Sequence, residues 1–248
     1  MEKLKCTISY DGTHFFGSQI QPNKRTVQGE IERALQKMHD GKHIRIYASG
    51  RTDTGVHAKG QVFHFETYLS IPERNWKRAL NSLLPDDIYV HEVKRVAADF
   101  HAQFDCVAKE YRYFILQNKE KDVFRRHFTY HYPYVLDLSQ MKRACELFQG
   151  THDFTSFCAA GSSVKGSKVR TLYEVRVEQK KDEIMILLRG DGFLYNMVRI
   201  IVGVLLDVGN GRLKADDIPV LIAAKDREKV SKTAPANGLF LWDVIYES

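Results

Sequence analysis

The sequence predicts an α+β protein made of two halves, residues 1–103 and 104–248, which share the ferredoxin-like element order β-α-β-β-α-β. Runs in which apolar and polar residues alternate, as in a half-buried strand, occur between runs in which apolar residues recur every three or four positions, as in an amphipathic helix. This order of patterns occurs twice, although the halves show no visible sequence similarity. The 248 residues are 44% hydrophobic, which is enough apolar material for real cores.

The first half is expected to contain four strands and two helices. In the first strand, alternation places Leu4, Cys6 and Ile8 on one face. At the second helix, Ser70 followed three residues later by Glu73 forms a capping-box pattern, which predicts that the helix opens there. The expected strands are residues 3–10, 45–49, 61–66 and 88–96, and the expected helices are residues 26–39 and the segment between Ser70 and Asp86.

The second half repeats the pattern and adds a further helix. Its most regular helical segment is residues 194–205, in which the apolar residues form a single stripe. The expected strands are residues 109–116, 169–179, 183–189 and 239–246, and the expected helices are residues 139–148, 194–205 and 216–224.

The composition indicates a protein of a reducing compartment. The 37 Lys and Arg exceed the 31 Asp and Glu by six, a surplus that permits a polyanionic partner without establishing one. The four cysteines are widely spaced and form no C-x-x-C pair, which disfavours zinc knuckles and thioredoxin-type chemistry. The longest apolar stretch, residues 197–208, carries two charges and is too short to span a bilayer. A cytoplasmic protein that does not enter a membrane is therefore expected, since the N-terminus also shows no signal-peptide pattern.

The most informative loop is predicted between two strands of the first half, at residues 49–61 (SGRTDTGVHAKGQ). Three glycines allow the backbone to adopt unusual conformations and to approach a ligand closely. Asp53 lies near the tip between two threonines, where it is either a functional carboxylate or an Asx-turn residue that bonds its own backbone. The composition of the loop alone favours the Asx-turn.

This loop also carries a family resemblance. Residues 50–58 (GRTDTGVHA) resemble the signature loop of tRNA pseudouridine synthases of the TruA family. Ser18 departs from the pattern, because family members usually have an aromatic residue there. The other segments that resemble the family, in the expected order along the chain, are residues 10–19 (YDGTHFFGSQ), 25–28 (RTVQ), 109–113 (KEYRY), 150–157 (GTHDFTSF), 193–199 (FLYNMVR) and 233–241 (TAPANGLFL).

The resemblance implies the pseudouridine synthase fold, with its two halves around a central cleft, and an isomerase that converts uridine to pseudouridine at positions 38, 39 and 40 of the tRNA anticodon stem-loop. The reaction breaks the N1–C1′ bond, turns the uracil and joins C5 to C1′. It consumes no group donor, so no cofactor is expected. A carboxylate suits this chemistry as a nucleophile or as a stabiliser of positive charge on the sugar. Attack on C1′, attack on the uracil ring and removal of a 2′ proton all remain open.

The resemblance also assigns site residues. Asp53 matches the catalytic aspartate, and Arg199 matches its basic partner, since a guanidinium can hold a carboxylate in forked geometry. Tyr111 matches the active-site tyrosine whose ring packs on the target base, and Leu239 matches the apolar residue on the other side of the pocket. Without the family, Arg199 is an ordinary helix arginine and Leu239 an ordinary core residue. Arg51 is expected to displace the base or to contact the phosphate backbone.

The remaining basic residues are ambiguous. His57 and Lys59 are each either a phosphate contact or a structural residue of the loop. The other basic residues are scattered, and they are as consistent with a solvated surface as with tRNA contacts: Lys24, Arg25, Arg125, Arg126, His127, Lys165, Lys168 and Arg170. The resemblance further predicts a homodimer with tRNA as its partner.

Three other functions are less well supported. A non-catalytic RNA-binding module is indicated only by residues 59–65 (KGQVFHF), whose alternating aromatics faintly resemble a base-stacking strand. A nucleotide cofactor is disfavoured, because residues 209–211 lack the third glycine of a dinucleotide fingerprint. A metal-dependent hydrolase has no recognisable ligand spacing, and no metal is expected at its candidate ligands, which are His57, His64, His101 and His152.

Overall fold

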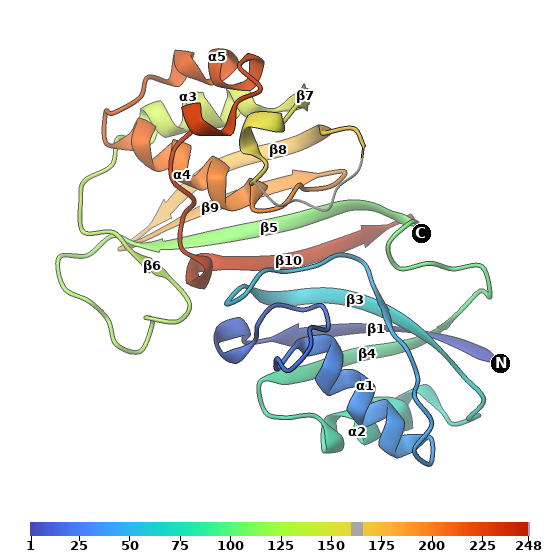
Figure 1. The fold of residues 1–248 in the computed structure, drawn as a ribbon. Coiled ribbons are helices and arrows are strands. Elements are labelled where there is room, and N and C mark those ends of the chain that lie inside the picture. The colour runs from blue at the N-terminus through green and yellow to red at the C-terminus, as the bar shows by residue number, and fades with distance from the viewer. Residues whose placement is uncertain (160–165, 248) are drawn as a thin grey trace. The chain divides into compact units, whose positions relative to one another are not determined.

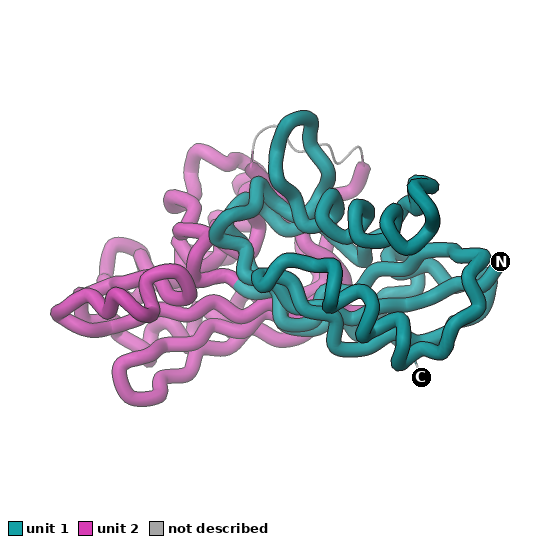
Figure 2. The backbone as a smooth tube through the Cα atoms, turned by 90° about the horizontal axis from the view of Figure 1, so that it is seen from below, with its two compact units in different colours: residues 1–107, 240–248 teal, residues 108–239 magenta. Residues whose placement is uncertain are grey.

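The computed structural model describes residues 1–159 and 166–247 and divides the chain into two compact units. Unit 1 comprises residues 1–107 and 240–248, and unit 2 comprises residues 108–239, as the two colours of Figure 2 show. The C-terminal strand therefore belongs to the compact unit that contains the N-terminus, whereas the sequence places it in the half 104–248. Both units combine strands with helices, which confirms the α+β class.

Unit 1 is a sheet with two helices (Figure 1). Strand β1 lies between β4 and β3 and is antiparallel to both, β2 pairs with β3, and β10 pairs with β3 in parallel. The strands are β1 (Glu2–Tyr10), β2 (Tyr47–Ala48), β3 (His57–Thr67), β4 (Ile88–Val96) and β10 (Leu239–Tyr246), and the helices are α1 (Val27–Met38) and α2 (Glu73–Leu83). A 3-10 helix, η1 (Gly12–His14), follows β1.

The core of unit 1 follows the predicted periodicities. Alternate residues of β1, including Leu4, Cys6 and Ile8, are buried as expected for a strand with one face on the core. Helix α1 begins where Thr26 caps it, because the Thr26 side chain accepts a hydrogen bond from the Gly29 backbone N–H. Ile31, which lies on the apolar stripe of α1, is buried as the periodicity predicts.

The predicted capping box at Ser70 is wrong. Helix α2 begins at Glu73 with Pro72 at its N-cap, and no side chain caps it. The Ser70 hydroxyl donates to a Glu2 carboxylate, and the Glu73 carboxylate accepts from the Arg95 backbone N–H. The S-x-x-E pattern is therefore used for contacts with neighbouring strands, because a proline at the N-cap cannot present a side-chain acceptor to the helix end.

In unit 2 the strands follow the order β5-β9-β8-β7, with antiparallel pairing between these neighbours. A two-residue strand, β6, pairs in parallel with β5. The strands are β5 (Cys106–Leu116), β6 (Tyr130–His131), β7 (Gly150–Asp153), β8 (Val169–Lys180) and β9 (Glu183–Gly190), and the helices are α3 (Leu138–Phe148), α4 (Met197–Gly209) and α5 (Ile218–Ala223).

Helix α4 is more extensively buried than α3 and α5, the other α-helices of unit 2. Eleven of its thirteen residues are buried, so it is apolar on nearly all sides, whereas the sequence predicts a helix with a single apolar stripe. The predicted start at Leu194 is also too early, because the helix begins at Met197 after Asn196 adopts a left-handed conformation, with φ of 58°.

None of the helices in the described part of the chain combines the length and apolar character that a membrane span requires. The four cysteines are free thiols, of which Cys6, Cys145 and Cys158 are buried.

Candidate active site

The loop that carries Asp53, residues 49–56 and called the Asp53 loop below, connects β2 to β3 in unit 1. It lies between two strands as the sequence predicts, but it is shorter than the predicted loop 49–61, because residues 57–61 already belong to β3. A second loop holds it. This second loop, residues 11–19, follows β1, and together with Tyr10 at the end of β1 it contributes backbone and side-chain hydrogen bonds to the Asp53 loop. At the far end of the Asp53 loop, the Gly55 backbone N–H donates to the Phe15 carbonyl at 3.3 Å. The Asp53 loop therefore has a defined conformation that does not depend on its own residues alone.

Thr52, the residue before Asp53, is buried, and all of its polar groups are bonded. Its backbone N–H donates to Ser18 Oγ at 2.8 Å, and its carbonyl accepts from the Ser18 backbone N–H at 3.0 Å. Its hydroxyl lies 2.7 Å from the Tyr10 hydroxyl. Burial raises the pKa of Tyr10 to about 12, despite hydrogen bonds from Thr52 and Gln61 that lower it, so Tyr10 stays a neutral hydroxyl.

Two glycines let the second loop approach this closely. A Cβ on Gly12 would lie 2.0 Å from the Val56 carbonyl oxygen, so no larger residue fits there without displacing the Asp53 loop. Gly17 has φ of +87°, and its Cβ would lie 2.9 Å from the Thr52 carbonyl oxygen.

His57, the first residue of β3, is a structural residue next to the Asp53 loop. Its ring is fully buried and stacks on Phe240, with ring centroids 4.6 Å apart. Its Nδ1 accepts a hydrogen bond from the Gly12 backbone N–H at 2.9 Å and lies 3.2 Å from an Asp11 carboxylate oxygen. Burial excludes His57 from direct contact with a phosphate, whereas Lys59 is exposed.

Asp53 and Arg51 are the members of the predicted site that lie in unit 1. The Asp53 side chain is half-buried, and its backbone carbonyl accepts from the Val56 N–H at 3.1 Å. Arg51 is exposed on the same loop. A half-buried carboxylate beside an exposed cation can both meet a ligand and stay shielded from bulk water on one side.

The other three predicted site residues lie in unit 2. Tyr111 is on β5, where its ring packs edge-on against Phe193, with ring centroids 5.0 Å apart. Its neighbour on the same strand face, Tyr113, is fully buried, as the sequence predicts. The Tyr113 hydroxyl donates to the Pro235 carbonyl at 2.8 Å, and burial raises its pKa well above the ordinary value.

Arg199 is oriented by two acceptors in unit 2. Its Nε donates to the Ala234 carbonyl at 2.7 Å, and its Nη1 donates to Asn196 Oδ1 at 2.9 Å. The Ala234 backbone N–H in turn donates to the Arg199 carbonyl at 3.0 Å. The segment 234–239 therefore contacts Arg199 through Ala234, contacts the core residue Tyr113 through Pro235 and ends at the buried Leu239. It links two predicted site residues, Arg199 and Leu239, within the unit.

Sequence reasoning missed the residues that support the site. In the sequence, Tyr10 is only part of a family motif and Ser18 only a departure from that motif, and Ala234 carries no side-chain signal because it acts through its backbone. A usable signal exists in residues 10–19, where two glycines follow a strand and indicate a close backbone approach.

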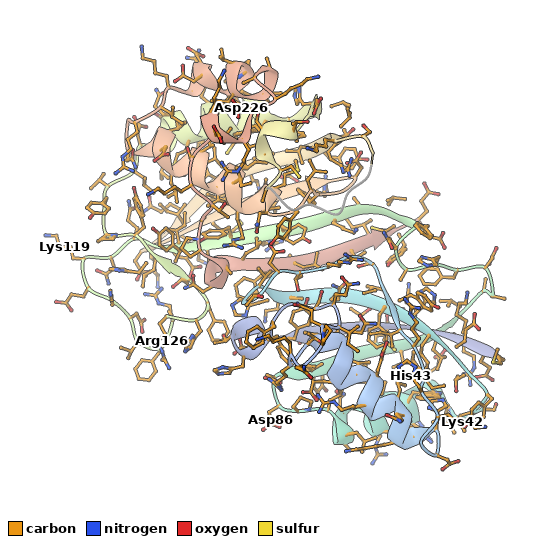
Figure 3. All side chains as sticks on the ribbon, in the orientation of Figure 1. Lys42, His43, Asp86, Lys119, Arg126 and Asp226 are labelled. Atoms are coloured by element: carbon orange, nitrogen blue, oxygen red, sulfur yellow. The ribbon has the colours of Figure 1, made fainter. Side chains whose placement is uncertain are left out.

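Several of the ambiguous basic residues are engaged by carboxylates. Arg25 forms a two-pronged pair with Asp87 at 2.7 and 2.9 Å, and this pairing raises its pKa. Arg125 pairs likewise with Asp182. Lys119 and Arg126, labelled in Figure 3, are exposed in the loop between β5 and β6. Lys165 lies outside the described residues.

The structure disfavours two of the alternative functions. The aromatic side chains of the candidate RNA-stacking strand, Phe63 and Phe65, are at most 1% exposed and therefore belong to the core of unit 1. Within residues 1–159 and 166–247, no group of three or more His, Cys, Asp or Glu side chains is arranged to hold a metal ion.

Comparison with known proteins identifies similar chains along the full length. The sequence model of one family, described as tRNA pseudouridine synthase, matches residues 7–105 and 144–247. A tRNA pseudouridine synthase A from Oceanobacillus iheyensis is 57% identical over 247 residues, which cover 100% of this chain and 98% of the relative. A tRNA pseudouridine synthase A 1 from Bacillus cereus is 54% identical over 248 residues, with 100% of both chains covered. A tRNA pseudouridine synthase A from Geobacillus kaustophilus is 56% identical and covers 99% of this chain and 95% of the relative.

Proposed function

The chain belongs to the tRNA pseudouridine synthase family, and from this premise we propose that it modifies uridines 38, 39 and 40 of the tRNA anticodon stem-loop with Asp53 as the catalytic carboxylate. As a member of this family it is an isomerase that acts on tRNA. The observation that carries the catalytic assignment is the Asp53 loop, in which the residue before the carboxylate is buried and hydrogen-bonded at every polar group.

The chemistry requires one group that acts where the glycosidic bond changes. The N1–C1′ bond breaks, the uracil turns, and C5 joins C1′. The proton on C5 is lost and N1 gains one, so the composition of the nucleotide is unchanged. An ionised aspartate supplies the negative charge that a nucleophile or a stabiliser of an electron-poor sugar needs.

The remaining site residues are assigned supporting roles. Arg199 serves as the basic partner of the catalytic carboxylate, and two acceptors already fix the orientation of its guanidinium. Tyr111 supplies an aromatic surface for the extruded uracil, for which stacking on a ring is worth about 1–3 kcal/mol. Leu239 supplies an apolar contact to the same base. The exposed Arg51 contacts the tRNA backbone or replaces the extruded base.

We also infer that each topological half, 1–103 and 104–248, is ferredoxin-like. In unit 1 the chain order is β1-α1-β2-β3-α2-β4, and β1 lies between β4 and β3, which supports this arrangement for the first half. In chain order, β10 follows α4 and α5 as the last strand of the second half, although its residues 240–248 belong to compact unit 1.

We further propose that the enzyme works as a homodimer in the cytoplasm. The family resemblance supports the dimer, and the four free thiols support a reducing compartment. Light scattering of the purified protein at working concentration is expected to give twice the mass of one chain, and a monomeric mass would contradict the dimer.

The variant Asp53→Asn tests the catalytic assignment. It removes the negative charge with little change in shape, so turnover is expected to fall at least about 10³-fold while tRNA binding stays nearly intact. Pseudouridine is mapped in bulk unmodified tRNA after incubation with each protein, and binding is measured separately on the same tRNA. Asp86→Asn is the matched control, because it makes the same change on an exposed turn between α2 and β4 (Figure 3).

Three outcomes count against the proposal. Full turnover by Asp53→Asn would refute the catalytic role of Asp53. Pseudouridine at positions other than 38, 39 and 40 would refute the choice of substrate site. Binding of tRNA without any pseudouridine formation by the unsubstituted protein would favour the RNA-binding alternative.

A further inference from the structure

Ser18 forms hydrogen bonds with the peptide groups on both sides of Thr52. The Thr52 N–H belongs to the peptide group shared with Arg51, and it donates to Ser18 Oγ. The Thr52 carbonyl belongs to the peptide group shared with Asp53, and it accepts from the Ser18 N–H. Two successive peptide planes leading into Asp53 are thus fixed by a single serine.

We propose that Ser18 is a positioning residue that sets the location of the Asp53 carboxylate through Thr52. This inference rests on the proposed catalytic role of Asp53. Ser18 and Thr52 are only 7% and 6% exposed, so water does not readily replace a lost hydrogen bond between them. A misplacement of about 1 Å is enough to cost about 10²-fold in rate, and rotation of one peptide plane produces shifts of this size.

The Ser18 hydroxyl bonds the peptide group between Arg51 and Thr52, which the other hydrogen bonds named below do not reach. The Asp53 loop is also attached through Gly55 to Phe15, through the adjacent His57 to Gly12, and through the Gly50 carbonyl to the Gln61 side chain. None of these bonds reaches the peptide group between Arg51 and Thr52. Loss of the Ser18 hydroxyl is therefore expected to leave the Asp53 loop attached through its other hydrogen bonds. The peptide group between Arg51 and Thr52, however, would lose its hydrogen bond and could rotate.

Tyr10 contacts the same residue, Thr52, through its side chain. Its hydroxyl lies 2.7 Å from Thr52 Oγ1 and holds the side chain of Thr52, whereas Ser18 holds the backbone. The two contacts act on the same residue, so their removal is expected to be non-additive. Comparing the single removals of the Tyr10 and Ser18 hydroxyls with their joint removal therefore tests whether Thr52 transmits their effect to Asp53.

The experiment compares Ser18→Ala with a matched hydroxyl removal in unit 2. Ser156 is fully buried, and its Oγ accepts from the Asp226 backbone N–H at 2.9 Å, so Ser156→Ala loses a similar bond far along the chain from Asp53. We expect Ser18→Ala to lower kcat on unmodified tRNA at least about tenfold with KM changed less than about twofold. Ser156→Ala is expected to lower the melting temperature without lowering kcat.

Two further variants make the result specific. Ser18→Thr keeps the hydroxyl and is expected to recover most of the lost kcat. Tyr10→Phe is expected to lower kcat less than Ser18→Ala, and the double variant Tyr10→Phe/Ser18→Ala is expected to lose less than the product of the two single effects. If Ser18→Ala does not fold, Ser18→Cys takes its place, because sulfur keeps the volume but is a weak acceptor.

The outcomes separate this inference from the proposed function. A kcat for Ser18→Ala within about twofold of the unsubstituted protein, while Asp53→Asn is inactive, refutes the positioning role and leaves the catalytic role in place. Equal losses of kcat in Ser18→Ala and Ser156→Ala also refute it, because they indicate general destabilisation. An active Asp53→Asn refutes the proposed function itself, whatever Ser18→Ala does.

Discussion

The two units position their candidate site residues in different ways. In unit 1, Asp53 lies on a loop whose conformation depends on a second loop 34 residues earlier in the chain, through Ser18 and Thr52. In unit 2, Tyr111 lies on the eleven-residue strand β5 and Arg199 lies in the first turn of helix α4. Regular elements fix a side chain by their own geometry, whereas a loop needs external hydrogen bonds to do so.

This difference has a consequence for the effects of mutation. A change in the loop support, such as loss of one hydroxyl at Ser18, alters geometry without removing any group that meets the substrate. A change on α4 or β5 acts mainly through the group that is removed, because the helix or strand keeps its course. The two units should therefore differ in how well a conservative substitution restores activity.

The largest effect in this comparison is expected for Arg199→Gln. This variant removes the guanidinium that is proposed as the basic partner of the Asp53 carboxylate, and it leaves the acceptors Ala234 and Asn196 without their donor. We expect kcat to fall about 10²–10³-fold with the fold of α4 unchanged. Steady-state turnover on unmodified tRNA and circular dichroism measure the two quantities.

The matched control is Arg212→Gln, an exposed arginine just beyond the C-terminus of α4 that pairs with Asp207. This control is expected to change kcat less than about twofold, because an exposed ion pair contributes little. Arg199→Lys is expected to recover only part of the activity, since lysine keeps the charge but loses the forked geometry. Full activity in Arg199→Gln would remove Arg199 from the proposed site.

Local sequence patterns predicted the elements well, because periodicity and caps act over a few residues. The predicted strands 88–96 and 239–246 match β4 and β10 at both ends, and the predicted helix 26–39 contains α1 with one extra residue at each end. The two- and four-residue strands β6 and β7 were missed, because so short a run carries no periodicity of its own.

The sequence patterns did not predict which segments, far apart in the chain, lie next to each other in the fold. The parallel pairing of β10 with β3 joins Phe240 to His57, and nothing in either segment specifies the other as its neighbour. The same limit applies to the candidate site. Asp53 is recognisable from its motif, but the hydrogen bonds that Ser18 and Tyr10 make to Thr52 depend on how two loops pack together. A serine between a glycine and a glutamine has no local feature that indicates this role.

The smallest expected effect is a difference between the two units in how their stability depends on pH. His64 on β3 of unit 1 is 3% exposed, and its Nδ1 accepts a hydrogen bond from the Ala102 backbone N–H, which requires an unprotonated nitrogen. Burial and the charges of His101 and Lys3 lower the pKa of His64 to about 4, against the weaker opposing effects of Glu66 and Asp105. Between about pH 6.5 and 4 the unfolded chain therefore binds a proton that the folded unit 1 does not, so the stability of unit 1 falls as the pH is lowered through this range.

A lowering of the His64 pKa by this amount is expected to reduce the free energy of unfolding of unit 1 by at most about 3 kcal/mol. In unit 2, hydrogen bonds from Thr155 and Lys225 lower the pKa of Asp153, so this carboxylate titrates below the same pH range. Amide hydrogen exchange at pH 7 and pH 5 is expected to show larger changes in β3 than in β9. His64→Phe should lower the stability at pH 7 and remove most of the slope, whereas the exposed control His14→Gln should keep the slope. An unchanged slope in His64→Phe would assign the pH response of unit 1 to other groups, because the ring of His64 would then not be the site that takes up the proton.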